Sequence, residues 1–163
     1  QYFALDRISD TQALDYLSHY LPSSDTVEKT LLLNLSNQMP LQAIQLAEAE
    51  WLSKRSEFLK DWQKLVNEKN MPMAIATKWN KALSFSDFVQ MFEYLLCDLI
   101  CVKLNQQVKN SDLDFTRLAE CYSLDSLFAI YSDLQQAKQF IGQNVQSNLV
   151  LEQLCIQLMN IEN

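Results

Sequence analysis

The sequence predicts an all-α protein in which a small three-helix bundle precedes a larger helical domain of five or six helices. Only one glycine and three prolines occur in 163 residues, well below the roughly 7% and 5% of average usage. The turn glycines that β-hairpins need are therefore missing. Hydrophobic residues make up 48% of the chain, enough for a real core. They recur at spacings of three and four, the period of an amphipathic helix.

Three short helical patterns fill residues 1–50, which we assign to the first domain. The predicted helices cover residues 10–20, residues 25–36 and the stretch that begins at Pro40. Ser9 and Gln12 have the spacing of a capping box at the first of these, and Pro40 is typical of a first helical turn. Amphipathic helices this short bury a joint core only as a bundle.

The remaining patterns form the second domain, over residues 51–163. The predicted helices cover residues 51–66, 72–83, 85–108, 115–122, 124–141 and 149–161. The helix over residues 85–108 has the broadest apolar arc, so we expect it at the centre of the domain. Gly142 is typical of a helix C-terminus, and Asn148 is a candidate N-cap for the last helix.

The charge is acidic and unevenly distributed. Thirteen basic and 20 acidic residues give a net charge of −7. Residues 1–50 contain seven carboxylates and two cations, so this part of the chain carries −5. Neither domain has the basic patch that direct nucleic-acid binding requires, so contact with DNA is expected only through partners. No apolar run reaches the ~18 residues of a membrane span. We expect a soluble cytoplasmic protein without membrane contact.

The first residue is Gln, and the apolar segment at residues 2–5 has no local partner. These two features lead us to expect a fragment of a longer chain whose upstream part is absent. The four cysteines all lie in apolar helical patterns, where thiols usually behave as small buried hydrophobes. Their placement is consistent with a reducing cytoplasm.

The sequence contains few of the residues that a catalytic or metal site needs. Cys97 and Cys101 share a helix face at i, i+4, but a structural zinc needs four ligands and His19 is the single histidine. We expect His19 at the surface near a helix C-terminus, where an imidazole suits the helix dipole. One glycine cannot form a phosphate loop. No catalytic residue, metal or cofactor is therefore predicted.

Four cations share the helix over residues 51–66. They are Lys54, Arg55, Lys60 and Lys64. A phosphate-binding stripe or a protein contact are possible interpretations, but Glu57 and Asp61 are interleaved with the cations. Glu57 with Lys60 has the spacing of an ordinary intrahelical ion pair, as Lys64 has with Glu68. The pattern favours a solvated face.

The three tryptophans, Trp51, Trp62 and Trp79, admit two interpretations. Tryptophans are more often core anchors than recognition platforms, yet they are also enriched in interface hot spots. The last helix raises the same question, because its leucines are spread around the helix. We take Trp62, Trp79, Leu149, Leu154 and Leu158 as interface candidates.

With these patterns in view, three stretches resemble the clamp-loader subunits of bacterial DNA polymerase III, and most closely the delta-prime subunits among them. LLLNLSNQMPLQAIQLAE, which ends at Glu48, resembles the end of the helical lid of an AAA+ module. Residues 144–158, NVQSNLVLEQLCIQL, are similar to the last collar helix. The opening residues 1–17 resemble the entry to the lid.

This resemblance implies that residues 1–50 are a lid and residues 51–163 a collar. In the family, an upstream AAA+ domain ends in a Ser-Arg-Cys motif whose arginine reaches a neighbouring subunit's nucleotide, and five subunits associate through their collars. Active loaders also carry a lid arginine in a Gly-Ser-x-Arg-like turn. Here the aligned residues are Gln38, Met39, Pro40 and Leu41. Leu41 cannot stabilise phosphate charge, which favours a delta-prime subunit that does not hydrolyse ATP.

The function expected from this resemblance is assembly rather than catalysis. The implied partners are the delta and gamma or tau subunits, with which the collar would associate to load the sliding clamp. Two alternatives stay open: the C-terminal part of an ATP-hydrolysing gamma/tau-like subunit, and an unrelated helical protein-interaction module. Restoring the upstream sequence would expose a phosphate-binding loop in the first case.

Overall fold

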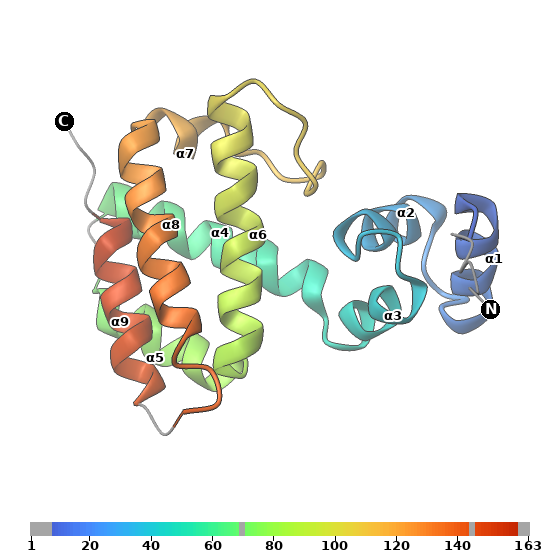
Figure 1. The fold of residues 1–163 in the computed structure, drawn as a ribbon, viewed down its shortest axis with the longest axis horizontal. Helices are drawn as coiled ribbons and strands as arrows, with labels where there is room; N and C mark the ends of the chain where they lie inside the picture. Colours follow the sequence, from blue (N-terminus) through green and yellow to red (C-terminus); the bar gives the residue numbers. More distant parts are fainter. Residues whose placement is uncertain (1–7, 69–70, 144–145, 160–163) are drawn as a thin grey trace, which may run out of the picture. The chain divides into compact units, whose positions relative to one another are not determined.

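The computed structural model of the chain describes residues 8–68, 71–143 and 146–159. Within these ranges the regular structure consists of nine α-helices without a β-strand (Figure 1), which confirms the all-α fold class. The chain divides into two compact units after Leu52, and the short segment Lys109–Ser111 clusters with the first unit.

The first unit contains three short helices that contact one another pairwise. They are α1 (Asp10–Tyr20), α2 (Thr26–Leu35) and α3 (Pro40–Glu48). The predicted capping box is present, because the Gln12 amide donates to the Ser9 hydroxyl at 3.3 Å and the Ser9 amide donates to Gln12 Oε1 at 2.9 Å. Leu17, Leu32 and Leu35 are fully buried and form the centre of this small core.

The turn between α2 and α3 is tightly wound. Asn37 and Gln38 have φ values of 53° and 63°, a left-handed conformation that asparagine tolerates better than most residues. The Gln38 amide reaches back to the carbonyl of Leu33 at 2.7 Å, which satisfies one of the carbonyls left open at the end of α2. Pro40 then occupies the first turn of α3, as predicted.

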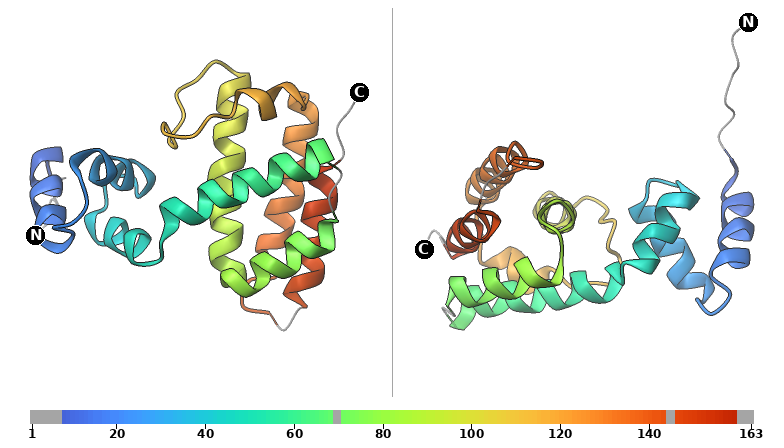
Figure 2. Two further views of the ribbon diagram at one scale, coloured as in Figure 1. Left: turned by 180° about the vertical axis from the view of Figure 1, so that it is seen from behind. Right: turned by 90° about the horizontal axis from the view of Figure 1, so that it is seen from below.

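Most of the second unit is helical. Its helices are α4 (Trp51–Glu68), α5 (Pro72–Ala82), α6 (Phe85–Lys103), α7 (Thr116–Glu120), α8 (Leu124–Lys138) and α9 (Ser147–Leu158); α4 begins two residues before the division. Helices α6, α8 and α9 run alongside one another, and α4 and α5 form a second layer that crosses them (Figures 1 and 2). Helix α5 packs on α9, and α8 contacts both α6 and α9.

An aromatic cluster fills the space between these layers. Phe58, Trp62, Trp79, Phe88 and Phe92 are all buried, and their ring centroids lie 5.0 to 6.2 Å apart. Most of these contacts are edge-to-face, the arrangement that aromatic quadrupoles favour. The rings of α4, α5 and α6 therefore interlock. In the layer of α6, α8 and α9 it is α8 that lies between the other two helices (Figure 1), so α6 does not have the central place that its apolar arc predicted.

Several helix ends differ from the sequence prediction. Helix α6 ends at Lys103 rather than near residue 108, because Asn105 turns into the left-handed region with φ 54°. Helix α8 ends at Lys138, and Gly142 follows with φ 80°. Helix α9 begins at Ser147 after a residue without a side-chain cap, so the prediction that Asn148 caps it is wrong. Residue 161, the predicted end of that helix, lies outside the described residues.

Candidate protein-interaction surface

Four of the five predicted interface residues are buried within the chain. Trp62 and Trp79 belong to the aromatic cluster with exposures of 0% and 1%, and Leu154 and Leu158 lie in the core face of α9. Contacts within the chain therefore occupy these four side chains. Leu149, by contrast, is 57% exposed and offers its surface to a partner.

Leu149 belongs to an uncharged exposed stripe on α9. Gln153 and Ile156 follow it at i+4 and i+7 and are also exposed, so the three residues share the face opposite Leu151, Leu154 and Leu158. Charged groups are depleted at the centres of protein interfaces. The two large aliphatic residues of the stripe suit such a centre, and Glu152, three residues after Leu149 and four before Ile156, places one carboxylate at its edge.

Further exposed apolar side chains lie on the neighbouring helix. Phe128 on α8 is 51% exposed, and Phe140 and Ile141, which follow α8, are 39% and 40% exposed. Helices α8 and α9 are antiparallel neighbours (Figure 1). Phe128 therefore lies at the same end of the pair as Ile156, and Phe140 and Ile141 lie at the end of Leu149. We call Phe128, Phe140, Ile141, Leu149 and Ile156 the α8–α9 surface.

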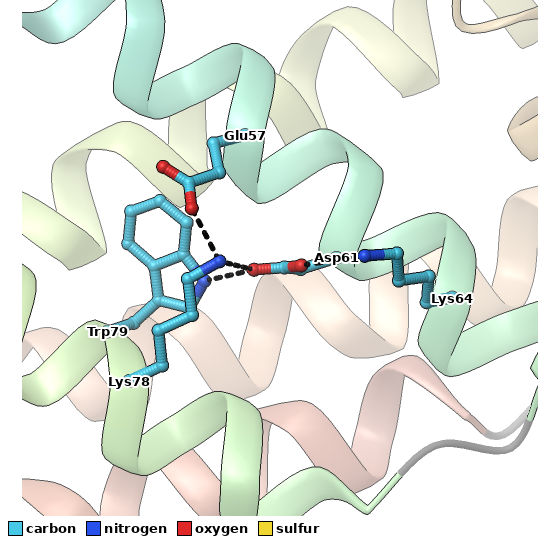
Figure 3. A network of polar contacts seen from close by, with 5 residues as sticks. All are labelled: Glu57, Asp61, Lys64, Lys78 and Trp79. Carbon is cyan, nitrogen blue, oxygen red and sulfur yellow. Dashed lines mark hydrogen bonds and ion pairs between the residues drawn. The ribbon is translucent and has the colours of Figure 1, made fainter.

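A buried carboxylate fixes α5, the helix on which α9 packs. Asp61 on α4 accepts hydrogen bonds from Lys78 Nζ at 2.6 Å and from Trp79 Nε1 at 3.0 Å (Figure 3). Lys78 also pairs with Glu57 at 2.6 Å. Desolvation lowers the pKa of Lys78, but the hydrogen bonds to Asp61 and Glu57 outweigh it and the pKa is raised. The ammonium therefore stays charged and ties α5 to α4.

The end of α9 is held by a buried tyrosine. Tyr122 accepts a hydrogen bond from Trp62 Nε1 at 2.8 Å and donates its own proton to the carbonyl oxygen of Leu158. Burial raises the pKa of Tyr122 above its ordinary value, so the phenol keeps the proton that it donates. The last turn of α9, including the position of Ile156, is thereby fixed relative to α4.

A third polar contact fixes α8. Glu93 on α6 accepts hydrogen bonds from Gln135 Nε2 at 2.8 Å and from Lys138 Nζ. Both donors lie in the second half of α8, shortly before Phe140. Because α8 and α9 are each anchored by buried or half-buried hydrogen bonds, the α8–α9 surface is carried by rigid elements, which suits a recognition surface.

The predicted solvated cation face on α4 is wrong for one of its members. Arg55 is 1% exposed and forms an ion pair with Asp112 at 2.6 Å. Lys60 and Lys64 are exposed as predicted. Lys64 pairs with Asp61 at 3.8 Å, not with Glu68. No local pattern predicts the Arg55 pair, since Asp112 lies 57 residues away.

The residue aligned with the lid arginine, Leu41, is 67% exposed near the start of α3. The preceding turn borders a hollow of about 530 Å³ lined by Ile8, Asp10, Asn37, Gln38 and Met39. The charged side chain in this lining is a carboxylate, which disfavours a phosphate. Lys109, which clusters with this unit, donates to Asn37 at 2.6 Å.

The remaining candidates for chemistry are dispersed. Cys97 and Cys101 are half-buried, and burial followed by the nearby Glu93 raises the pKa of Cys97. Burial raises the pKa of Cys155 to about 12. His19 is exposed in the last turn of α1. Among the described residues, no group of three histidine, cysteine or carboxylate side chains could hold a metal, and no helix could span a membrane.

Comparison with family models identifies the second unit. Residues 49–160 match the family described as DNA polymerase III, delta subunit, C terminal, a match that covers more than half of the 163 residues. No curated protein and no solved structure matches the chain. The matched range includes the helices α4 to α9 and the whole α8–α9 surface. The chain therefore belongs to the family of C-terminal domains of the DNA polymerase III delta subunit, a clamp-loader family.

Proposed function

We propose that this chain is the lid and collar part of a delta-prime subunit of the bacterial DNA polymerase III clamp loader. Its role is to assemble with the delta and gamma or tau subunits, without chemistry of its own, in the replication machinery of the cytoplasm. The observation that carries the proposal of a clamp-loader subunit is the match of residues 49–160 to the delta subunit family, and the choice of delta-prime rests on the sequence resemblance. The first unit would then be the lid, and the second the collar.

The α8–α9 surface is the proposed site of collar association. Its five apolar side chains are between 39% and 57% exposed, and exposed apolar groups gathered on one pair of helices mark protein-interaction sites. Phe128 and Phe140 contribute aromatic rings, which are enriched at the centres of interfaces. A partner that covers them would gain apolar burial and would also meet Glu152, which lies between Leu149 and Ile156 on the helix surface, and Asp125, which lies next to Phe128.

The choice of delta-prime over an ATP-hydrolysing subunit is supported by the α2–α3 turn. An exposed leucine, Leu41, stands where the resemblance places an arginine in active loaders. Asp10 contributes a negative charge to the adjoining hollow. Leu41 cannot replace the guanidinium that the resemblance places here, and a cation near this turn, Lys109, is bonded to Asn37.

Size-exclusion chromatography with purified delta and gamma subunits of the same organism tests the proposal. The full-length protein should co-elute with them in a stable complex. The double variant Leu149→Asp/Ile156→Asp should lose that complex, because it introduces two charges into the uncharged stripe. Val27→Asp is the matched control, since Val27 is 76% exposed and lies in the first unit.

Circular dichroism of each variant shows whether the fold is retained. A folded Leu149→Asp/Ile156→Asp variant that still assembles would place the collar interface elsewhere. Absence of a complex with the wild-type protein would contradict the proposed assembly with the delta and gamma subunits. ATP hydrolysis by the purified full-length protein, retained in the absence of other subunits, would favour the gamma/tau-like alternative.

A further inference from the structure

An aromatic face on α1 takes no part in the function proposed above. Tyr16, His19 and Tyr20 occur at i, i+3 and i+4, so their side chains share one side of the helix. Tyr16 and Tyr20 are 38% and 54% exposed, and His19 is exposed as well. The core side of α1 is formed by Ala13 and Leu17, which are 1% and 0% exposed. Tyr16 and Tyr20 follow Ala13 and Leu17 at i+3, so the aromatic face borders the core side of α1 and stays partly exposed there.

The rings of this face are held in one arrangement. The centroids of Tyr16 and Tyr20 lie 4.7 Å apart with an angle of 39° between the ring planes, and His19 stands edge-on to Tyr20 at 5.2 Å. A hydrogen bond between the two tyrosine side chains raises the pKa of Tyr16. Contacts of this kind reduce the freedom that the rings would lose on binding, so the face is partly preorganised.

The electrostatic setting is acidic. The described residues of the first unit hold six carboxylates against two lysines, a net charge of −4. Lys29 is buried and donates to Ser18 at 3.3 Å, and Lys109 donates to Asn37. Asp15 is exposed and precedes His19 by four residues, which places a carboxylate at the His19 edge of the aromatic face.

We propose that the Tyr16–His19–Tyr20 face of α1 is a docking surface for a basic segment of a partner protein, one that presents arginine side chains. Guanidinium groups stack on tyrosine faces and pair with carboxylates, and this face offers two tyrosines, with Asp15 at its opposite edge beside His19. The net charge of −4 repels the phosphates of nucleic acid, which would otherwise be the second class of ligand to stack on exposed rings.

The probe for the experiment is a fluorescein-labelled peptide of nine arginines, titrated with the whole chain at about 0.15 M salt and followed by fluorescence anisotropy. The variant Tyr16→Leu/Tyr20→Leu removes both rings while it keeps the charge and most of the apolar area. Because this variant loses two exposed cation–π contacts, it should bind the peptide about fivefold or more weakly than wild type. Tyr16→Phe/Tyr20→Phe keeps the ring faces and should bind within about twofold of wild type.

Two variants that each remove one negative charge distinguish a docking site from general attraction of the peptide to an acidic protein. Asp15→Asn and Glu48→Gln each remove one exposed carboxylate of the first unit, but only Asp15 lies at an edge of the aromatic face. Asp15→Asn should weaken binding at least about threefold more than Glu48→Gln, because screening limits attraction over more than about 10 Å. Circular dichroism should show the same helix content for all variants.

The proposal would be overturned, and only non-specific attraction would remain, if Asp15→Asn and Glu48→Gln had equal effects and Tyr16→Leu/Tyr20→Leu had none. Tighter binding of a fluorescein-labelled single-stranded DNA than of the arginine peptide would overturn it as well. Amide chemical shifts should confirm the site, with the largest changes on α1. Changes confined to α3 or to the second unit would contradict it.

Discussion

At the scale of single residues, Asp61 is the polar group on which α4 and α5 most depend. Its carboxylate is the acceptor for the buried indole N–H of Trp79, whereas Lys78 is 41% exposed and keeps contact with water. Asp61→Ala therefore leaves a buried donor without its acceptor. We expect a loss of about 1 to 3 kcal/mol in the free energy of unfolding, measured by urea denaturation.

The matched control is Glu57→Ala, which removes the other carboxylate bound to Lys78. Glu57 is 56% exposed, and exposed ion pairs contribute only about 0 to 1 kcal/mol. A loss for Glu57→Ala as large as that for Asp61→Ala would show that the ion pair with Lys78, and not the bond to Trp79, provides the stabilisation.

Cys155 should make stability depend on pH in the alkaline range. Burial raises its pKa from 9.0 to about 12 in the folded protein, so the unfolded chain ionises first. The contribution is complete below pH 9 and is lost as the pH rises from 9 to 12, by about 1.4 kcal/mol per pH unit. Wild type should therefore lose about 2 kcal/mol more than Cys155→Ala between pH 8 and pH 10.5.

Urea denaturation of both proteins at the two pH values measures this difference. Cys155→Ala leaves a small cavity, and that cost does not change with pH. All other titratable groups are the same in the two proteins, so their contributions cancel in the comparison. Parallel stability curves for the two proteins would mean that the Cys155 thiol ionises as readily in the folded chain as in the unfolded one.

Arg55 shows that a helical pattern does not predict contacts between residues that are far apart in the sequence. On α4 it alternates with carboxylates in a pattern typical of a solvated face, and Lys60 and Lys64 of the same pattern are exposed. The burial of Arg55 depends on Asp112, which the fold brings within 2.6 Å from 57 residues away. The spacing of residues along α4 does not indicate this contact.

At the scale of helices, the α6 N-terminus offers a clean test of capping. The Ser84 hydroxyl accepts a hydrogen bond from the Asp87 amide at 3.1 Å and donates to Asp87 Oδ2 at 2.6 Å. Ser84→Ala removes both bonds and should cost about 0.5 to 2 kcal/mol of stability. Because α6 contributes Phe88 and Phe92 to the aromatic cluster, we expect the loss in the unfolding of the second unit, followed by tryptophan fluorescence.

Ser86→Ala is the control for that substitution. Ser86 is exposed one residue inside the same helix, where alanine has the higher helix propensity. It should leave the stability unchanged or raise it slightly. A loss comparable with that of Ser84→Ala would point to a general effect of hydroxyl removal near this turn, and would contradict a specific capping role.

Helix starts were predictable to a greater extent than helix ends. Ser9, Pro40, Pro72 and Ser84 are local signals, and α1, α3, α5 and α6 begin beside them. The ends of α6 and α8 fall several residues earlier than predicted. Nothing in the apolar pattern marks Asn105, whose left-handed conformation ends α6. Asparagine adopts the left-handed conformation only in a minority of cases, and the surrounding structure determines where it does so.

At the scale of the whole molecule, the sequence was informative about the family but not about its contact surface. The resemblance to clamp-loader subunits agrees with the family match over residues 49–160. Among the leucines of α9, however, Leu154 and Leu158 are buried and Leu149 is exposed. Their sequence pattern is that of a helix with leucines on more than one side. Which side faces the core depends on α5 and α8, which a single sequence does not position.

The two units should also differ in stability, because their cores differ in size. The first unit has about fifty residues, and a core of that size rarely supplies more than roughly 3 to 5 kcal/mol. The second unit has twice that length and an aromatic cluster that includes Trp62 and Trp79. We expect the first unit to unfold at lower urea concentration than the second.

Two probes followed in the same titration test this expectation. Ellipticity at 222 nm reports the helices of both units, whereas fluorescence is dominated by Trp62 and Trp79, with Trp51 on the first unit's side of the division. Ellipticity should begin to fall before the main fluorescence transition, and Trp51→Phe should remove any early change in fluorescence. Coincident transitions from both probes would show that the units unfold together, since α4 begins in one and continues through the other.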